Sequence, residues 1–228
     1  ARAVEVDGVD IFPELLQRPG FDEWALRRAG LPTEALRTLR AIPSYYLSYY
    51  YATDQALAKQ QAGHHRAEEV IAIEKELLAM YRDPALDHKP DLLSRRGGAF
   101  YSTAAAALAT SLLTGDGAHH YVNIRNNGLV PGMADDDVIE VSAHADLNGA
   151  RPAASRPVAP EMLGLMQAVT SYEVLTIDAA TSGDPDIAKR ALIAHPLVRQ
   201  WEKVSTVFPT MVEANERFLP AFAECEHV

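Results

Sequence analysis

Hydrophobic and polar positions alternate at the start of the chain. Val4 and Val6 precede the dipeptide Asp7-Gly8, and Val9 and Ile11 follow it. Two short alternating runs around Asp-Gly predict a β-hairpin with a two-residue turn. The sequence begins with Ala rather than Met and leads straight into this hairpin. We therefore expect it to be part of a larger protein.

Helical spacing of apolar residues follows the hairpin. The segments "FPELL", "FDEWALRRAG" and "LPTEALRTLRAIP" predict three short helices. The second is expected to end at Gly30, and the third to have Thr33 as its N-cap and Pro43 near its end. A long helical tract over residues 44–84 comes next and is ended by Asp83-Pro84. One face of this tract carries an apolar stripe of Val70, Ile73, Leu77 and Met80 or Tyr81.

The second half of the chain mixes helices with strands. An Ala-rich helix is expected from about Ser102 to Gly115, and β-rich runs in 119–130 and 135–146 predict two strands. A Pro-rich stretch over 149–162 then leads into a helical region whose last helix is predicted from about Pro209 to Phe222. These elements predict one α+β domain over residues 1–228, mostly helical, with a small antiparallel or mixed sheet.

Composition and charge narrow the class of protein. The 228 residues are 48% hydrophobic and 23% charged, which is typical of a globular protein. A net charge of −10 without a long basic run argues against binding to nucleic acid. The acidic balance fits a cytoplasmic protein. The apolar run "AAAALATSLL" is too short to span a membrane, and no signal peptide is visible. Cys225, the single cysteine, excludes an internal disulfide and a Cys-rich zinc site.

Tyrosines are concentrated in one segment. Residues 42–51, "IPSYYLSYYY", hold five of the chain's nine tyrosines, and Tyr46, Tyr49 and Tyr50 would share one face of a helix. Packing explains such a cluster most simply, because tyrosine fills the edge of a core. The alternative is a tyrosinate acting as a base. Phenols in water titrate near pH 10, so this role requires a nearby cation or metal.

Other polar groups give weaker signals, and no nucleotide-binding, zinc-protease or hydrolase motif occurs. His65 and Glu69 have the spacing of metal ligands on a helix, although solvated surface residues have the same pattern. The pairs His64-His65 and His119-His120, and the run Asp135 to Asp137, are equally ambiguous. Arg95 and Arg96 beside Gly97-Gly98 suit an anion-binding loop or an ordinary turn. Arg66 opens a helical stretch, where a positive charge is disfavoured by the helix dipole.

A succession of segments nonetheless resembles a known family. The segments "VDGVDIFPELL", "YYLSYYY", "RAEEVIAIEKELLAMYRDP", "RRGGAFYSTAAAALA", "VNIRNNGLVPGMADDDVIEV" and "AHPLV" occur in order across nearly the whole chain. They resemble the C-terminal part of glycoside hydrolase family 4, within it most closely the 6-phospho-β-glucosidases. The resemblance implies a domain similar to the C-terminal domain of the lactate and malate dehydrogenases. In this family it follows an N-terminal Rossmann domain that holds NAD.

The same resemblance implies a mechanism and two site residues. In this family NAD takes a hydride from C3 of the sugar, a divalent metal, usually manganese, polarises the ketone, and a base removes the C2 proton before the aglycone leaves. The base is the first Tyr of a Tyr-Leu-x-Tyr-Tyr motif, which is Tyr46 here. An Arg that opens the family's Arg-Ala-x-Glu-Val motif contacts the sugar phosphate or its surroundings, which is Arg66 here.

The two assignments impose a geometric condition. On one straight helix, positions 46 and 66 would lie roughly 30 Å apart, too far to serve one sugar. We therefore predict that the helical tract breaks between them, near Gly63.

The sequence also departs from the family pattern. The glycine-rich NAD loop and the family's metal-binding Cys-Asn-x-Pro and Asn-His segments are absent from these residues. The chain alone is expected to bind neither NAD nor metal and to be inactive, with its own N-terminal Rossmann domain and homo-oligomeric partners as implied partners. The substrate implied is a phosphorylated disaccharide or aryl glucoside. Two alternatives stay open: a 6-phospho-α-glucosidase or α-galactosidase of the same family, and a non-catalytic oligomerisation domain with packing tyrosines.

Overall fold

The structure is a computed structural model, and it describes residues 3–63, 66–97, 100–153 and 157–223. The chain divides into two compact units, Ala1–His65 and Arg66–Val228. The fold class is confirmed as α+β, mostly helical with small sheets, and both sheets are antiparallel. No helix in the described ranges is long and apolar enough to cross a membrane.

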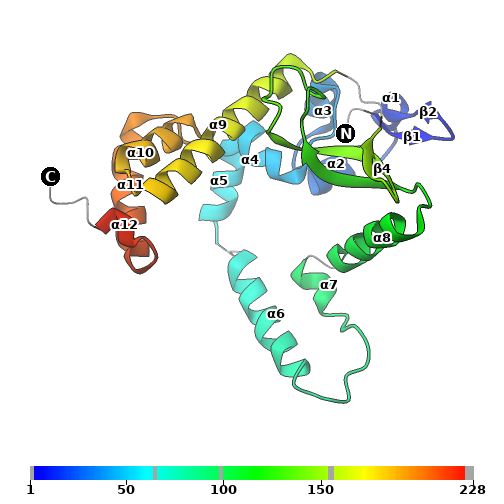
Figure 1. Ribbon diagram of the computed structural model, residues 1–228, viewed down its shortest axis with the longest axis horizontal. Helices are drawn as coiled ribbons and strands as arrows, with labels where there is room; N and C mark the ends of the chain where they lie inside the picture. Colours follow the sequence, from blue (N-terminus) through cyan, green and yellow to red (C-terminus); the bar gives the residue numbers. More distant parts are fainter. Residues whose placement is uncertain (1–2, 64–65, 98–99, 154–156, 224–228) are drawn as a thin grey trace. The chain divides into compact units, whose positions relative to one another are not determined.

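The first unit contains the predicted hairpin and a series of short helices (Figure 1). Asp7 and Gly8 both have positive φ, 50° and 78°, as a tight turn between antiparallel strands requires, so the hairpin prediction is confirmed. The elements of this unit are β1 (Glu5–Val6), β2 (Val9–Asp10), α1 (Phe12–Leu15), α2 (Phe21–Ala29), α3 (Thr33–Leu39), η1 (Tyr45–Leu47), α4 (Ser48–Tyr51) and α5 (Thr53–Gln61).

The core of the first unit lies between α2 and α3. Its buried residues are Phe21, Ala25, Ala29, Leu31 and Leu36, and Tyr51 and Ala52 pack against them. The α2 helix ends where predicted, with Gly30 in the left-handed conformation. The N-cap prediction for Thr33 is wrong, because α3 begins at Thr33 itself and the cap position is Pro32. The Thr33 side chain is instead buried, at 6% exposure.

Gly30 also sets the path of the chain towards the tyrosine segment. A Cβ atom on Gly30 would lie 2.7 Å from Cβ of Ser48, a buried residue at the start of α4. Only glycine therefore allows the end of α2 to approach this closely. The contact fixes where η1 and α4, and with them the tyrosines, begin.

The long helical tract is interrupted at two places. Ala52, with φ −135° and ψ 46°, separates α4 from α5, and the Thr53 hydroxyl donates to the carbonyl oxygen of Tyr49 at 2.8 Å. After α5 ends at Gln61, Gly63 has φ 91°, and a new helix begins at Arg66. The predicted break near Gly63 is therefore confirmed. The break at Ala52 was not predicted.

The second unit begins with two helices joined by a loop, and continues into a sheet and a helical group (Figure 1). The predicted stripe on α6 is confirmed, since Ile73 and Leu77 are buried. The elements are α6 (Arg66–Met80), α7 (Leu93–Arg96), α8 (Tyr101–Thr114), β3 (His119–Arg125), β4 (Val138–Asp146), β5 (Gly149–Pro152), α9 (Pro160–Ser182), α10 (Pro185–Ala194), α11 (Trp201–Asn215), η2 (Glu216–Phe218) and α12 (Pro220–Ala223).

The sheet of the second unit has the order β3-β4-β5. The two predicted strands pair in a register that places Ile124 opposite the buried Ile139. The third strand, β5, was missed, because its sequence Gly-Ala-Arg-Pro was taken as the start of a Pro-rich loop. Proline is tolerated here, since Pro152 ends a strand at the edge of the sheet.

Asn126 organises the loop between β3 and β4. Its side chain is completely buried. Nδ2 donates to the carbonyl oxygens of Val130, Met133 and Ala134 at 3.1 to 3.2 Å, and Oδ1 accepts from the Val130 amide at 2.7 Å. One amide side chain thus satisfies four backbone groups of the loop.

The predicted start of the last helix is wrong. That helix was expected to begin at about Pro209, but α11 runs from Trp201 to Asn215 with Pro209 inside it. An interior proline removes a backbone hydrogen bond. Here Val204, which is fully buried, and Phe208 lie one helical turn apart and anchor the apolar face. Tertiary packing therefore outweighs the proline signal.

Candidate functional site

Tyr46 lies in the first unit, on the 3-10 turn η1. Its side chain is 77% exposed, so the phenol oxygen is not sealed in the apolar core. Neighbouring tyrosines take the packing role: Tyr51 lies against the core, and its ring meets that of Tyr50 edge to face at 5.1 Å. Tyr45 lies close to Gly30. The cluster therefore divides into tyrosines that pack against their neighbours and Tyr46, the most exposed of the five.

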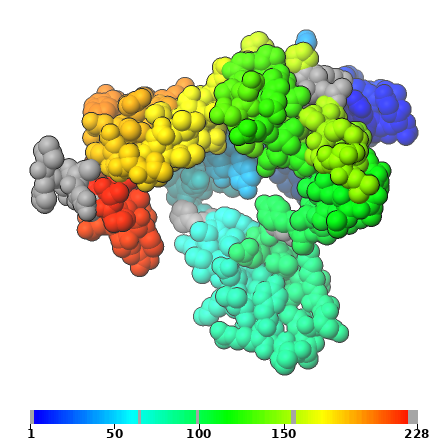
Figure 2. All heavy atoms as spheres, viewed as in Figure 1, coloured from blue at the N-terminus to red at the C-terminus, as the bar shows by residue number. Residues whose placement is uncertain are grey.

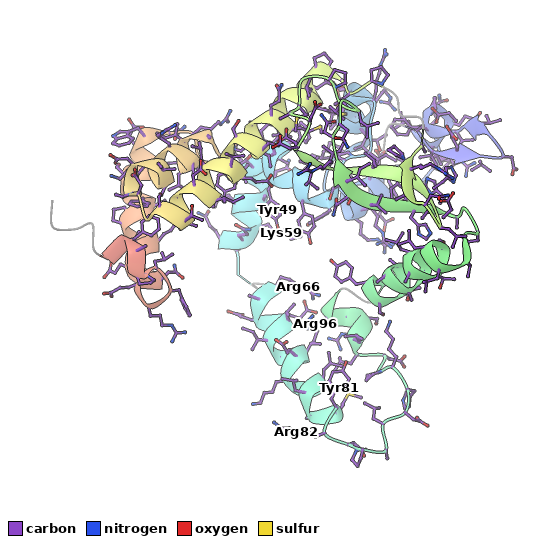
Figure 3. All side chains as sticks on the ribbon, viewed as in Figure 1. Tyr49, Lys59, Arg66, Tyr81, Arg82 and Arg96 are labelled. Atoms are coloured by element: carbon purple, nitrogen blue, oxygen red, sulfur yellow. The ribbon has the colours of Figure 1, made fainter. Side chains whose placement is uncertain are left out.

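Arg66 lies in the second unit, as the first residue of α6. Its Nη1 forms an ion pair with Oε2 of Glu69, and its Nη2 donates to the carbonyl oxygen of Arg95. Arg96 at the end of α7 pairs with Glu74 of α6, with 3.1 Å between Nη2 and Oε1. Figure 3 shows Arg66 and Arg96 between the facing sides of the two helices. Tyr46 and Arg66 belong to different units.

Residues 66–97 form a continuous mass in the space-filling view (Figure 2). The loop between α6 and α7 returns the chain so that Arg95 meets the start of α6, 29 residues earlier. Both pairs of charged side chains remain about half exposed, between 41% and 54%. The two arginines of the predicted anion loop thus have different roles: Arg95 offers its carbonyl oxygen to Arg66, and Arg96 joins the two helices.

The other histidine and aspartate candidates have structural partners. His64, His65, Gly98 and Cys225 lie outside the described residues. His119 bonds the Ser142 hydroxyl, and His120 lies on the opposite face of β3, with Nε2 2.8 Å from Oγ of Ser111. Asp137 accepts the amide of Ala134 at 2.8 Å within an exposed turn. In the described part of the chain, no group of three or more His, Cys, Asp or Glu could hold a metal ion.

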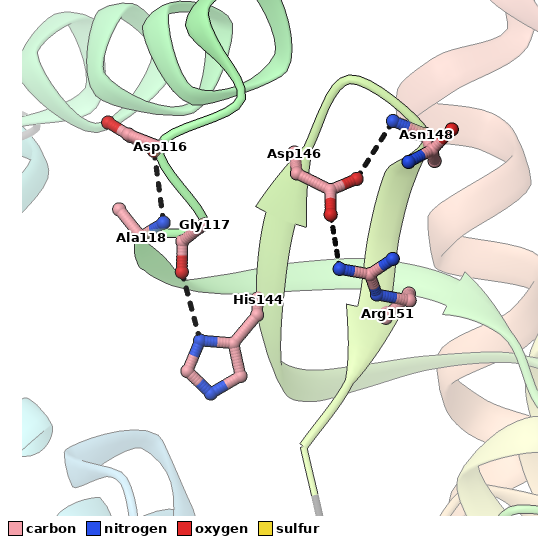
Figure 4. A network of polar contacts seen from close by, with 7 residues as sticks. All are labelled: Asp116, Gly117, Ala118, His144, Asp146, Asn148 and Arg151. Carbon is pink, nitrogen blue, oxygen red and sulfur yellow. Dashed lines mark hydrogen bonds and ion pairs between the residues drawn. The ribbon is translucent and has the colours of Figure 1, made fainter.

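A network of polar contacts surrounds the C-terminal end of β4 (Figure 4). Asp116 accepts the Ala118 amide at 3.0 Å, and this hydrogen bond is the main cause that lowers the pKa of Asp116. The Asn148 amide, 2.8 Å from Oδ1 of Asp146, similarly lowers the pKa of Asp146, with Arg151 as a further partner. His144 donates from Nδ1 to the carbonyl oxygen of Gly117. These contacts stabilise turns of the sheet.

An apolar cavity lies among the C-terminal helices of the second unit. It has a volume of about 330 Å³ and is lined by residues of α9, α10, α11, η2 and α12, among them Tyr172, Leu192, Phe208, Met211, Phe218 and Phe222. A shallower groove of about 580 Å³ runs past Asp137, Gln167 and Ser171. The sequence predicted neither. The cavity lining contains no pair of side chains suited to acid–base catalysis. We therefore interpret the cavity as a gap in the packing of the C-terminal helices.

Comparisons with known proteins identify a family and several relatives to which this chain is similar. Residues 1–198 match the model of the "Family 4 glycosyl hydrolase C-terminal domain". The chain is 33% identical to a probable 6-phospho-β-glucosidase of Bacillus subtilis over 96% of its own length and 52% of that protein. It is 24% identical to the maltose-6′-phosphate glucosidase of the same organism, over 78% of the chain and 40% of that protein.

A solved structure gives the same result. The 6-phospho-β-glucosidase of Thermotoga maritima, determined with NAD and glucose 6-phosphate, superposes with a TM-score of 0.83 at 32% identity, over 96% of this chain and 52% of that one. A further structure of that enzyme also contains manganese. The chain thus spans about half the length of the relatives it matches.

Proposed function

Since the chain belongs to glycosyl hydrolase family 4, matching its C-terminal domain, we propose that it is the C-terminal, substrate-side domain of a 6-phospho-β-glucosidase. The similarity to the Thermotoga maritima enzyme, across nearly the whole chain, is the observation that carries this proposal. Identity to the β-specific relative is 33%, against 24% for the maltose-6′-phosphate glucosidase, which favours a β-linked substrate over an α-linked one.

The cofactors of the proposed enzyme are held outside this chain. NAD and a divalent metal, with manganese favoured by the relative's structure, would supply the redox and Lewis-acid chemistry. The described residues do not offer a metal-binding donor set, and we assign no ligand among them. An N-terminal Rossmann domain would contribute both sites. NAD and phosphorylated sugars are cytoplasmic metabolites, which supports a cytoplasmic enzyme.

Tyr46 is assigned the role of the base that takes the proton from C2 of the sugar. Its high exposure leaves the phenol oxygen accessible to a substrate, and the contact of Gly30 with Ser48 fixes the turn that carries it. A tyrosinate at neutral pH requires a nearby positive charge. The proposal therefore needs the rest of the enzyme to bring a cation close to this oxygen.

Arg66 is assigned to the phosphate group of the substrate. A guanidinium has five N–H donors in a planar fork that matches phosphate oxygens. Two nitrogens of Arg66 each use one donor on Glu69 and Arg95, which leaves three donors for a ligand. The confirmed break of the helical tract near Gly63 removes the single straight helix that would have held Tyr46 and Arg66 too far apart.

The exposed surface of α8 supports further partners. This helix has no charged residue over 101–114, yet Tyr101 and Leu113 are 80% and 79% exposed. An uncharged helix that exposes large apolar side chains is normally covered by another surface. We propose that α8 packs against the N-terminal domain, or against a second copy of the chain in a homo-dimer or tetramer.

The experiment that tests this function uses the full-length enzyme. Aryl 6-phospho-β-glucosides, aryl 6-phospho-α-glucosides and the unphosphorylated β-glucoside are compared, each with and without NAD and manganese. We expect turnover of the phosphorylated β-glucoside alone, dependent on both NAD and metal. Preferential cleavage of the α-linked substrate would establish the alternative specificity within the family. Cleavage without NAD would contradict the mechanism.

A further inference from the structure

The guanidinium of Arg66 is held from two sides, by groups that have no assigned role. We propose that Glu69 and the carbonyl group of Arg95 are positioning groups that orient Arg66 for the phosphate of the substrate. This inference rests on the function proposed above, and it assigns Glu69 as a positioning residue for the same site.

The contacts fix the orientation of the guanidinium plane. Nη1 is paired with Glu69 and Nη2 with the carbonyl oxygen of Arg95, so two different nitrogens of one planar group are held. The remaining donors are on Nε and on the second hydrogen of each terminal nitrogen. The side chain is 54% exposed, so these donors are open to a ligand. Two contacts that hold a donor group and leave further donors free are what ligand positioning requires.

The local structure explains why Arg66 needs such support. As the first residue of α6 it lies at the positive end of the helix dipole, where a cation is disfavoured. Glu69, in the first turn, offsets this charge. Arg66 also shares a helix face with Ile73, seven residues later, which is buried. The carbonyl of Arg95 lies in the last turn of α7, where backbone acceptors lack helical partners.

Stability is a poor explanation for the Arg66–Glu69 pair. Both side chains are about half exposed, 54% and 50%, and the pair has i,i+3 spacing. Exposed pairs of this kind contribute little to stability. Loss of Glu69 should therefore leave thermal unfolding nearly unchanged, and its effect should appear in substrate binding.

The charge of Glu69 gives the proposal a clear sign test. A carboxylate beside an anion site repels the phosphate, so if Glu69 only neutralised Arg66, its removal would strengthen substrate binding. If Glu69 orients Arg66, its removal weakens binding because the guanidinium loses its fixed plane. The two roles predict opposite changes in KM.

The chain offers a matched control on the same two helices. Glu74 pairs with Arg96 at 3.1 Å, with side chains 47% and 41% exposed, and also links α6 to α7. Glu74→Gln removes the same charge from the same helix, without touching Arg66. It separates loss of a helix-to-helix ion pair from loss of Arg66 positioning.

The experiment measures KM and kcat for an aryl 6-phospho-β-glucoside, and the inhibition constant of inorganic phosphate, in the full-length enzyme. The variants are Arg66→Ala, Glu69→Gln and Glu74→Gln. We expect Glu69→Gln to raise KM and the phosphate inhibition constant about tenfold with little change in kcat. Arg66→Ala should raise both further. Glu74→Gln should stay within about twofold, and both Gln variants within about 2 °C of the parent melting temperature.

The outcomes separate failure of the inference from failure of the proposed function. If Arg66→Ala changes neither constant, the phosphate role of Arg66 falls, and the inference with it. If Arg66→Ala weakens binding but Glu69→Gln behaves like Glu74→Gln, or lowers KM, the phosphate role stands and the positioning role is overturned. A large fall in melting temperature for Glu69→Gln would make its role structural and would equally overturn the inference.

Discussion

Replacing Gly30 with alanine tests how the first unit holds its tyrosine segment. Gly30 has φ 68°, and a Cβ atom there would lie 2.7 Å from Cβ of Ser48, 3.0 Å from Oγ of Ser48 and 3.3 Å from Cε2 of Tyr45. Ser48 is buried, so it cannot swing into solvent to make room. The substitution must therefore move α2 and the η1–α4 segment apart.

The structure sets the magnitude as the sum of two terms. A non-glycine residue in the left-handed region costs about 1 kcal/mol. Carbon atoms normally approach to about 3.5 to 4.0 Å, and relieving such an overlap in a packed core costs about 1 to 3 kcal/mol. We expect Gly30→Ala to lower the free energy of unfolding by about 2 to 4 kcal/mol.

Gly20→Ala is the matched control at the other end of α2. Gly20 has φ 79°, but no atom lies within 4 Å of the position of its Cβ. It should therefore show the conformational term alone, about 1 kcal/mol. Urea unfolding of the chain and its two variants, at constant m-value, measures both. Equal destabilisation of the two variants would refute the reasoning, because the contact with Ser48 would then contribute nothing.

Two further substitutions test the second unit. Asn126→Ala leaves four backbone groups of the β3–β4 loop without their buried partner and should lower the free energy of unfolding in urea by about 3 kcal/mol. Asn123→Ala, at an exposed position of β3, should be nearly neutral. Similar losses for the two variants would contradict the role of Asn126 in holding the loop. Burial lowers the pKa of His195 below its ordinary value of 6.5, so the unfolded chain binds more protons below that pH and stability is lost as the pH falls. His195→Asn retains an acceptor for the Leu197 amide and should flatten the loss of stability as the pH falls below 6.5 in urea unfolding. An unchanged slope for His195→Asn would contradict the assignment.

Local signals in the sequence predicted many of the elements correctly. Asp7-Gly8, Gly30 and Gly115 each need a positive φ that glycine or a turn residue supplies, and each ends or turns an element as expected. Such signals act over a few residues. They identify an element without any knowledge of what packs against it.

The wrong or missing predictions result from packing between residues that are far apart in the sequence. β5 is a strand only because β4 offers a partner edge, and α11 continues through Pro209 because its apolar face is anchored by the buried Val204. Thr33 resembles an N-cap in sequence, but burial places it inside the first turn of α3. Residue patterns do not contain these partners, so each local rule was overridden by tertiary contacts.

The candidate site likewise combines features that the sequence predicted with a feature that only the tertiary structure shows. The family resemblance pointed to Tyr46 and Arg66, and the need for a break between them followed from helix geometry. The contact of Arg66 with the carbonyl oxygen of Arg95 joins residues 29 positions apart through a loop, and no sequence spacing predicts it. The orientation of Arg66, on which the proposed role of Glu69 depends, could therefore be seen only in three dimensions.

Proton exchange at C2 of the sugar tests the central assignment most directly. The full-length enzyme with NAD and manganese is incubated with a 6-phospho-β-glucoside in D₂O, and deuterium at C2 of the glucose 6-phosphate formed is measured by NMR. Tyr46→Phe removes only the hydroxyl group, and Tyr49→Phe is its control within the same segment. We predict that deuterium enters C2 with the parent enzyme and with Tyr49→Phe, and that turnover and C2 exchange fall at least about a hundredfold with Tyr46→Phe. Near-normal C2 exchange in Tyr46→Phe would contradict the account.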